Sequence, residues 1–268
     1  MIGRSFILGW AAVLLMAGSA PAQDNPPATD DWDLSHDPAS KVTMASVSFS
    51  SGQTVAVRCV DGSFDVMIAG LAPHTNAEST SLPMAATIEG RPISGVWRSN
   101  EARTTGFSTV PRMAARQLRQ GGDIETVLEI GNDTTRRYMF DLPADHNNLD
   151  RVMEACGVPF SDARDDLPSS WTADENGTGP LWAERPNISN SYPRQALQRG
   201  ISGSATVSCI VQSRGRLRDC RVESEQPRGA GFGASLITAA QDARLIMPED
   251  PATAIGSLVL VTANYLAP

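Results

Sequence analysis

Residues 192–240 constrain the fold more than any other part of the chain, because helix and strand patterns follow one another there with clear boundaries. Tyr192-Pro193 predicts an extended residue followed by a helix start, since proline disfavours the helical conformation in the residue before it. Residues 195–199 are good helix formers, and Gly200 is a typical helix terminator. The segment therefore opens with a short helix.

Alternation of apolar and polar residues begins at residue 204 and predicts an antiparallel hairpin. Four side chains point to one face of its first strand: Ala205, Val207, Cys209 and Val211. We expect Arg214 and Gly215 to form a two-residue loop. This register places Cys209 opposite Cys220, and it also places Val207 opposite Val222. The same pairing thus aligns the apolar face and the two thiols.

A second helix and a last strand complete the pattern. Six residues recur at helical spacing before Pro248 ends the run: Phe232, Leu236, Ala239, Ala240, Ala243 and Ile246. Residues 257–266 then form an apolar strand. The predicted order of elements is αββαβ.

Residues 182–268 resemble the C-terminal domain of the TonB family in the order and spacing of several short motifs. The matching positions are Tyr192-Pro193, Ala196, Gly200, Gly203, Gly215, Val222-Glu223-Ser224, Pro227, Gly229 and Phe232-Gly233-Ala234. The resemblance implies a three-stranded antiparallel sheet with two helices on one face. It also implies a domain that binds other proteins and carries no catalytic site.

The N-terminus has the three parts of an export signal. Arg4 supplies a positive charge, residues 6–18 are apolar, and Ala20-Pro21-Ala22 suits cleavage after Ala22. We expect residues 1–22 to be removed and the protein to lie in the periplasm of a Gram-negative bacterium. The apolar run is shorter than the roughly 20 residues of a spanning helix. An uncleaved inner-membrane anchor, with membrane contact at that helix, is the alternative.

Residues 40–157 alternate like a mostly antiparallel β domain, so the whole chain is predicted to be α+β. Six strands are expected, at 55–57, 64–68, 84–88, 93–97, 124–130 and 138–142, together with a helix at 111–121. The final strand and the amphipathic segment 149–156 faintly resemble periplasmic modules of the invasion-associated locus B type. No functional residue is carried over from that resemblance.

Two polar stretches flank this domain: segment 23–39 before it and linker 158–181 after it. Neither resembles the long proline-rich spacer of full TonB energy transducers. The signal region also lacks the intramembrane histidine that their anchors carry. These departures argue against energy coupling.

Four cysteines in an exported chain predict disulfides, for which three pairings exist. One bond in each domain is the simplest partition. Cys209 would pair with Cys220 across the hairpin, with a bulge if their side chains stand too far apart. Cys59, on strand 54–60, would then pair with Cys156. Zinc is the alternative, but the sequence has no CxxC spacing and its histidines are distant from the thiols.

Catalytic and cofactor motifs are not evident, so we expect neither an enzyme nor a cofactor. Residues 229–233 are glycine-rich but lack the spacing of a nucleotide loop. His36, His74 and His146 lie in polar sequence, where solvated loop histidines are expected. A net charge of −8 argues against nucleic acid as the main partner.

We predict a periplasmic module that binds a protein or peptide, such as a TonB-dependent outer-membrane receptor or another envelope protein. Strand addition to the last strand would supply main-chain hydrogen bonds. The candidate partner-binding residues are Tyr192, Pro193, Leu258, Val259, Leu260, Val261, Thr262 and Ala263. The same edge could instead pair with a second copy in a homodimer.

Two other function classes stay open. An uncleaved N-terminus would make the protein a membrane-anchored TonB-like energy transducer for transport across the outer membrane. Alternatively, the protein could be an envelope enzyme or sensor that acts through its N-terminal domain. The sequence offers no group of residues that would carry such an activity.

Overall fold

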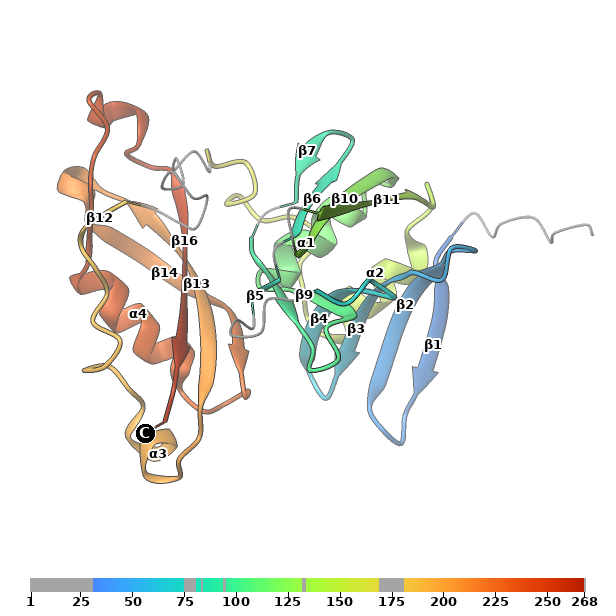
Figure 1. The fold of residues 1–268 in the computed structure, drawn as a ribbon, viewed down its shortest axis with the longest axis horizontal. Coiled ribbons are helices and arrows are strands. Elements are labelled where there is room, and N and C mark those ends of the chain that lie inside the picture. Colours follow the sequence, from blue (N-terminus) through green and yellow to red (C-terminus); the bar gives the residue numbers. More distant parts are fainter. Residues whose placement is uncertain are drawn as a thin grey trace, which may run out of the picture.

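The computed structural model describes residues 31–74, 81–82, 84–93, 95–131, 134–168 and 181–267. It shows an α+β protein with few helices, in which every described strand pair is antiparallel. The predicted export signal at 1–22 lies outside the described residues. We call residues 31–168 the N-terminal half and residues 181–267 the C-terminal half (Figure 1).

The N-terminal half contains two sheets, whose strand orders are β1-β2-β3-β4-β9-β8-β5 and β11-β10-β6-β7. The strands of the first sheet are β1 (Asp33–Asp37), β2 (Val42–Ser48), β3 (Thr54–Val60), β4 (Ser63–Ala69), β5 (Ser81–Leu82), β8 (Trp97–Ser99) and β9 (Thr105–Ser108). Those of the second are β6 (Met84–Ile88), β7 (Arg91–Pro92), β10 (Gly122–Gly131) and β11 (Thr134–Leu142). Two helices accompany them, α1 (Pro111–Leu118) and α2 (Asn147–Ala155).

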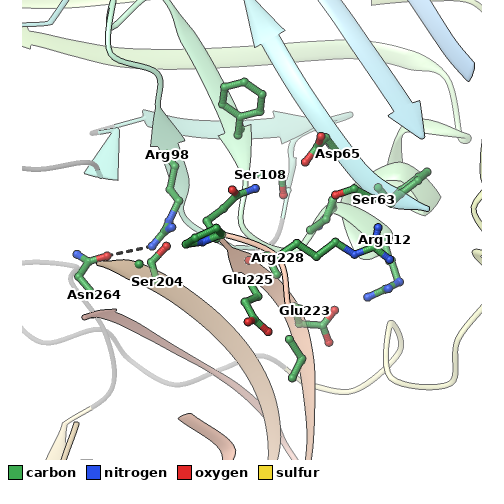
Figure 2. A pocket seen from close by; sticks show the side chains of 18 of the residues that line it. Ser63, Asp65, Arg98, Ser108, Arg112, Ser204, Glu223, Glu225, Arg228 and Asn264 are labelled. Atoms are coloured by element: carbon green, nitrogen blue, oxygen red, sulfur yellow. Dashed lines mark hydrogen bonds between the residues drawn. The ribbon is translucent and has the colours of Figure 1, made fainter. Parts of the chain in front are cut away.

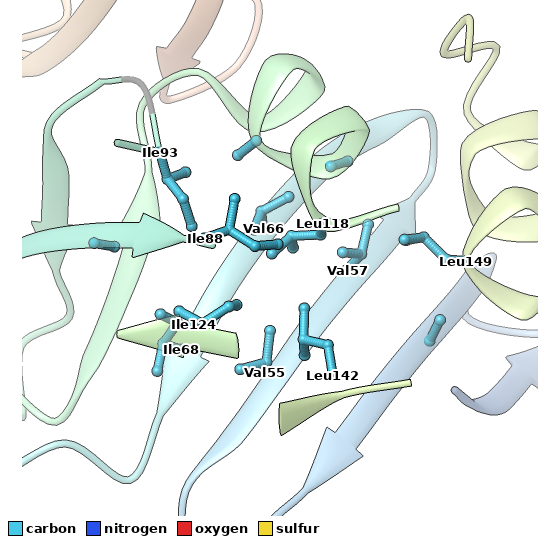
Figure 3. Packing of buried hydrophobic residues seen from close by; sticks show 14 of the residues in the cluster. Val55, Val57, Val66, Ile68, Ile88, Ile93, Leu118, Ile124, Leu142 and Leu149 are labelled. Atoms are coloured by element: carbon cyan, nitrogen blue, oxygen red, sulfur yellow. The ribbon is translucent and has the colours of Figure 1, made fainter. Parts of the chain in front are cut away.

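One hydrophobic cluster joins both sheets and both helices of this half. Figure 3 shows Val55 of β3 in one cluster with Ile88 and Ile124 from the second sheet, Leu118 of α1 and Leu149 of α2. All of these side chains are nearly inaccessible to solvent. The two sheets therefore share a single core, which fits their apolar alternation.

The C-terminal half is built on a three-stranded sheet of order β14-β13-β16 and a two-stranded β12-β15 pair. Its elements are β12 (Trp182–Glu184), α3 (Arg194–Gln198), β13 (Gly203–Val211), a 3-10 turn η1 (Ser213–Gly215), β14 (Leu217–Gln226), α4 (Phe232–Asp242), β15 (Arg244–Leu245), a second 3-10 turn η2 (Pro251–Thr253) and β16 (Leu258–Tyr265). Phe232 and Leu236 of α4 share a core with Val207 of β13 and Val261 of β16.

The second helix is shorter than predicted. Helical spacing suggested a helix that reaches Ile246, but α4 ends at Asp242. The next residues form β15, where Leu245 pairs with Trp182 of β12. Tertiary pairing with a distant segment overrides the local helical pattern here, and periodicity within 232–246 contains no information about that partner.

The strand predictions of the N-terminal half need similar corrections. The strand predicted at 93–97 is displaced, because β8 begins at Trp97. Strands β1, β2 and β9 were not predicted, and β1 lies within the segment 23–39 that reads as a polar spacer. Four of the five β1 residues are exposed, so the strand carries almost no apolar alternation that would reveal it.

The β13–β14 hairpin keeps the predicted pairing of Val207 with Val222 but not the predicted two-residue loop. Val211 pairs with Leu217, and η1 fills the wider turn. The register shifts by one residue between Ser208 and Ile210, which is a bulge opposite Cys209. Arg214 and Gly215 both have positive φ, 61° and 70°. A side chain at Gly215 would also collide with the backbone of Leu245.

The structure contains two disulfides, Cys59–Cys156 and Cys209–Cys220, in the pairing that the simplest partition gave. The first ties β3 to the residue that follows α2, with a Cα–Cα distance of 5.6 Å. The second crosses the hairpin at the bulge, with a Cα–Cα distance of 4.1 Å. Each half therefore contains one disulfide, and no disulfide joins the two halves.

Removing the two disulfides one at a time should have unequal effects. The bonds close sequence separations of 97 and 11 residues. On the chain-entropy model they contribute about 5 and about 3 kcal/mol to the free energy of unfolding, because a longer closed loop restrains the unfolded chain more. We expect C59S/C156S to lose more stability than C209S/C220S in urea unfolding. An equal or reversed loss would contradict this prediction.

His74 is buried, with 3% of its surface exposed, whereas the sequence led us to expect a solvated loop histidine. Its Nε2 lies 3.0 Å from the Ser99 hydroxyl, and its carbonyl oxygen accepts a hydrogen bond from Arg103. Burial, and then the positive charge of Arg103, lower the pKa of His74 below its ordinary value of 6.5. His36, in contrast, is exposed as predicted.

This lowered pKa predicts a loss of stability in mild acid. Above pH 6.5, His74 is neutral in both the folded and the unfolded protein. As the pH falls below 6.5, the unfolded chain binds a proton before the folded protein does, so the free energy of unfolding decreases until the pH has passed the lower folded-state pKa. We expect the urea midpoint of H74Q to fall less steeply than that of the wild type between pH 6.5 and pH 5. The exposed control H36Q should keep the wild-type slope. Parallel slopes for all three proteins would refute the assignment.

Candidate functional site

The outer edge of β16 is the first candidate site. β16 is the last strand of its sheet, and it pairs with β13 on one side only. The Leu258 N–H points away from β13, because it donates to the Pro168 carbonyl oxygen at 2.8 Å. Antiparallel alternation then directs the N–H and C=O groups of Leu260, Thr262 and Asn264 outward as well. Within the described residues, none of these outward groups has a backbone partner.

Most of the predicted partner-binding side chains on β16 are buried. Val259, Val261 and Ala263 face α4 and belong to the core of the C-terminal half. Leu258 packs against Val110 and Met113, next to α1. Of the six predicted β16 positions, Leu260 is partly buried and Thr262 is exposed. Recognition at this edge would therefore use the backbone more than the side chains.

Tyr192 and Pro193, the other two predicted positions, lie at the start of α3. The Tyr192 hydroxyl donates to the Ile201 carbonyl oxygen at 2.8 Å. Its ring makes edge contacts with Phe232 at 5.7 Å and with Tyr265 at 5.4 Å between centroids. Pro193 is the residue before the first turn of α3. Tyr192 thus contacts Tyr265, the last residue of β16, within an aromatic cluster. Its observed contacts are those of a packing residue.

The face of the sheet opposite α4 is polar yet covered. Ser204, Thr206 and Ser208 of β13 are buried, although they alternate with the apolar core positions. The hydroxyls of Thr206 and Thr262 lie 2.9 Å apart. At one end of this face, Leu258 and Leu260 pack against residues of the N-terminal half. Burial of these hydroxyls is tolerated because they find hydrogen-bond partners.

Arg164 anchors this face to the segment that leads out of the N-terminal half. Its side chain is 9% exposed and donates to the Ser208 hydroxyl at 2.8 Å and to the Asp219 carbonyl oxygen. Ser208 in turn donates to Glu223 at 2.5 Å. Val158 is buried in the N-terminal core, and Asp165 pairs with Arg116 of α1. The described part of the predicted linker, 158–168, is therefore bound to both halves.

Replacing Arg164 should destabilise the protein. R164M removes the donor to Ser208 and Asp219 and leaves the buried Ser208 hydroxyl without that partner. We expect a loss of about 2 kcal/mol in the free energy of unfolding, measured by urea denaturation. The matched control R194M changes an exposed arginine of α3 and should stay within about 0.5 kcal/mol of the wild type. Similar stabilities for the two variants would exclude Arg164 as an anchor.

The second candidate site is a cleft of about 930 Å³ between the two halves (Figure 2). The N-terminal half contributes β4, β8, β9 and the first turn of α1 to its walls. The C-terminal half contributes the start of β13, the end of β14 and the end of β16. The charged and amide side chains that line the cleft are Arg58, Asp65, Arg98, Arg112, Glu223, Glu225, Gln226, Arg228 and Asn264.

Hydrogen bonds hold the walls of the cleft at fixed points. The Ser224 hydroxyl donates to the Thr109 carbonyl oxygen at 2.7 Å. Arg228 donates to the Asp61 carbonyl oxygen at 2.8 Å, and Arg98 donates to the Asn264 side-chain oxygen at 3.0 Å. The cleft is thus spanned by hydrogen bonds between the two halves.

The described residues contain no group of three or more His, Cys, Asp or Glu that could hold a metal ion. None of the helices in this part of the chain has the length and apolar character needed to cross a membrane.

Sequence reasoning did not identify the cleft or the role of Arg164. The arginines of the cleft come from strands and loops far apart in the chain, between residues 58 and 228. Each one, taken alone, reads as a solvated surface residue. The only available signal was the alternation of β13, whose polar positions Ser204, Thr206 and Ser208 are small enough to be covered.

Residues 189–251 match the family described as "Gram-negative bacterial TonB protein C-terminal". This confirms the predicted resemblance for the segment from just before α3 to the start of η2. The match ends before β16, so the candidate edge lies beyond it. No curated protein matches the chain. The match supports a TonB-like protein-interaction module of envelope transport.

Proposed function

We propose that the C-terminal half is a periplasmic protein-binding module that adds an extended segment of its partner to the outer edge of β16. In this proposal α3, β13, β14, α4 and β16 form the αββαβ core of a TonB-type domain. The short strands β12 and β15 are additions to it. The domain boundaries expected from the sequence stay predictions: a polar segment 23–39, a domain 40–157, a linker 158–181 and a domain 182–268.

The observation that carries the proposal is the outer edge at residues 260, 262 and 264, whose outward groups have no backbone partner among the described residues. An extended segment placed there can form a regular antiparallel or parallel ladder with these backbone groups. Thr262 and Asn264 are exposed, and Leu266 beyond them is 81% exposed. The C-terminal end of β16 is therefore the accessible part of the edge.

An outer-membrane receptor or another envelope protein is the proposed partner, because the family match lies in the same half of the chain. No catalytic group is needed for this role. A membrane-anchored energy transducer is the alternative, in which residues 1–22 stay attached as an anchor. N-terminal sequencing of the exported protein separates the two, since a mature chain that begins at Gln23 has no such anchor.

Proline at Thr262 tests the edge directly. T262P removes one outward N–H while leaving the bonds to β13 in place, and proline is tolerated on edge strands. T262V is the matched control, since it keeps the N–H and removes only the hydroxyl. A photo-crosslinker at Leu266 in intact cells should capture an envelope protein in the T262V background and lose it in T262P.

The position of the crosslinker supplies a second control. Met139 of β11 is also exposed, at 67%, but lies in the N-terminal half. We expect a crosslinker at Met139 to capture a different set of proteins or none. Identical capture from both positions, or full capture by folded T262P, would sink the strand-addition proposal. A product of twice the protein's mass would show instead that β16 pairs with a second copy.

A further inference from the structure

The cleft between the two halves contains more positive charge than its own acidic groups neutralise. Four arginines and three carboxylates line it. Asp65 pairs with Arg58 at 3.0 Å. The Glu225 carboxylate accepts the N–H groups of Gly231 and Phe232, at 2.6 and 3.2 Å, where α4 begins. Glu223 accepts the Ser208 hydroxyl, so each carboxylate already has a partner within the protein.

Arg98 is the arginine with the least compensation. It is partly buried in β8, and its guanidinium donates to the neutral side-chain oxygen of Asn264. No carboxylate of the described residues forms an ion pair with it. Burial lowers the pKa of Arg98. A partly desolvated guanidinium that lacks a counter-ion is a binding group for an anion, because a carboxylate would replace the water that it has lost.

Arg112 adds a second free cation. It lies in the first turn of α1, is exposed, and forms no hydrogen bond or ion pair with the described residues. In Figure 2, Arg98 lies at the Asn264 end of the cleft and Arg112 lies on the side of Glu223 and Arg228. The two guanidinium groups therefore extend the positive charge along the cleft.

The walls also offer unpaired backbone. β4 pairs with β9 only from Met67 to Ala69, so residues 63–66 have no strand on that side. β14 is the outer strand of the C-terminal sheet, and residues 222–226 line the cleft. Hydrogen-bonding groups of two strand edges thus border the same space as the arginines. An extended peptide can use both kinds of contact.

We propose that this cleft binds a short extended peptide that carries a carboxylate, and that Arg98 binds that carboxylate in place of Asn264. The planar guanidinium matches a carboxylate with two parallel hydrogen bonds. A volume of about 930 Å³ lies within the range of known ligand sites. The carboxylate belongs either to the C-terminus of the peptide or to an acidic side chain. The site shares Asn264 with the outer edge of β16, but Leu260 and Thr262 of that edge do not line it.

Three alanine-rich pentapeptides with blocked N-termini distinguish a C-terminal from a side-chain carboxylate when each is titrated calorimetrically into the full exported protein. The first carries a central glutamate and an amidated C-terminus, the second carries a free C-terminal carboxylate, and the third carries neither. We expect at least one of the first two to bind about tenfold more tightly than the third. This binding should weaken as salt rises, because the attraction is between charges.

Variants of Arg98 then locate the carboxylate. R98Q should lose about tenfold in affinity for the preferred peptide. R98K keeps the positive charge but cannot form two parallel hydrogen bonds with a carboxylate, so it should lose less affinity than R98Q. R112Q should weaken the same peptide by a smaller factor. R136Q is the matched control, because it changes an exposed arginine of β11 that does not line the cleft, and it should bind the peptide as the wild type does. Thermal unfolding of each variant checks that it is folded.

Several results would overturn the proposal. These are equal binding of all three peptides, no binding of any, or wild-type affinity in folded R98Q. If R98Q does not fold, the comparison of the three peptides on the wild-type protein still decides whether a carboxylate is recognised, and R112Q decides whether the cleft recognises it. T262P should leave peptide binding in the cleft unchanged, so this test and that of the β16 edge can fail independently.

Discussion

The burial of β13 on both faces is the constraint on which the rest of the C-terminal half depends. One face, with Val207 and Cys209, packs against α4, and the other, with Thr206 and Ser208, is covered although it is polar. The polar face of an antiparallel strand can be solvated, but when it is buried its hydroxyls need hydrogen-bond partners within the protein. Arg164 supplies such a hydrogen bond at Ser208, and through that contact the end of the N-terminal half is joined to the sheet.

This arrangement determines which features of the sheet stay accessible. With both faces of β13 covered, the outer edge of β16 remains as an accessible feature of the sheet, and its C-terminal end is the most exposed part. The contact between the halves also creates the cleft in which Arg98 meets Asn264 of that same strand. The C-terminal half thus borders a cleft that exists only because the N-terminal half is present.

Particular elements show how far sequence reasoning reaches. Residues 54–60 and 203–211 were predictable as strands because their alternation is strong, and the helix start at Phe232 follows from the glycine-rich turn before it. The end of α4 was not predictable, since β15 forms only because Trp182 lies beside it. The bulge at Cys209 was anticipated from the disulfide, but the wider turn was not, because no pattern of apolar residues reveals the positive φ of Arg214.

The sequence by itself determined the mixed α+β class, the resemblance of the C-terminal segment to the TonB family and the pairing of its cysteines by simple partition. These properties depend on local patterns or on a small set of alternatives. Only the tertiary structure decided that His74 and Arg164 are buried, which side chains of β16 face the core, and that no carboxylate of the described residues pairs with Arg98. The physical reason is that burial and charge compensation depend on neighbours distant in sequence, which local periodicity does not specify.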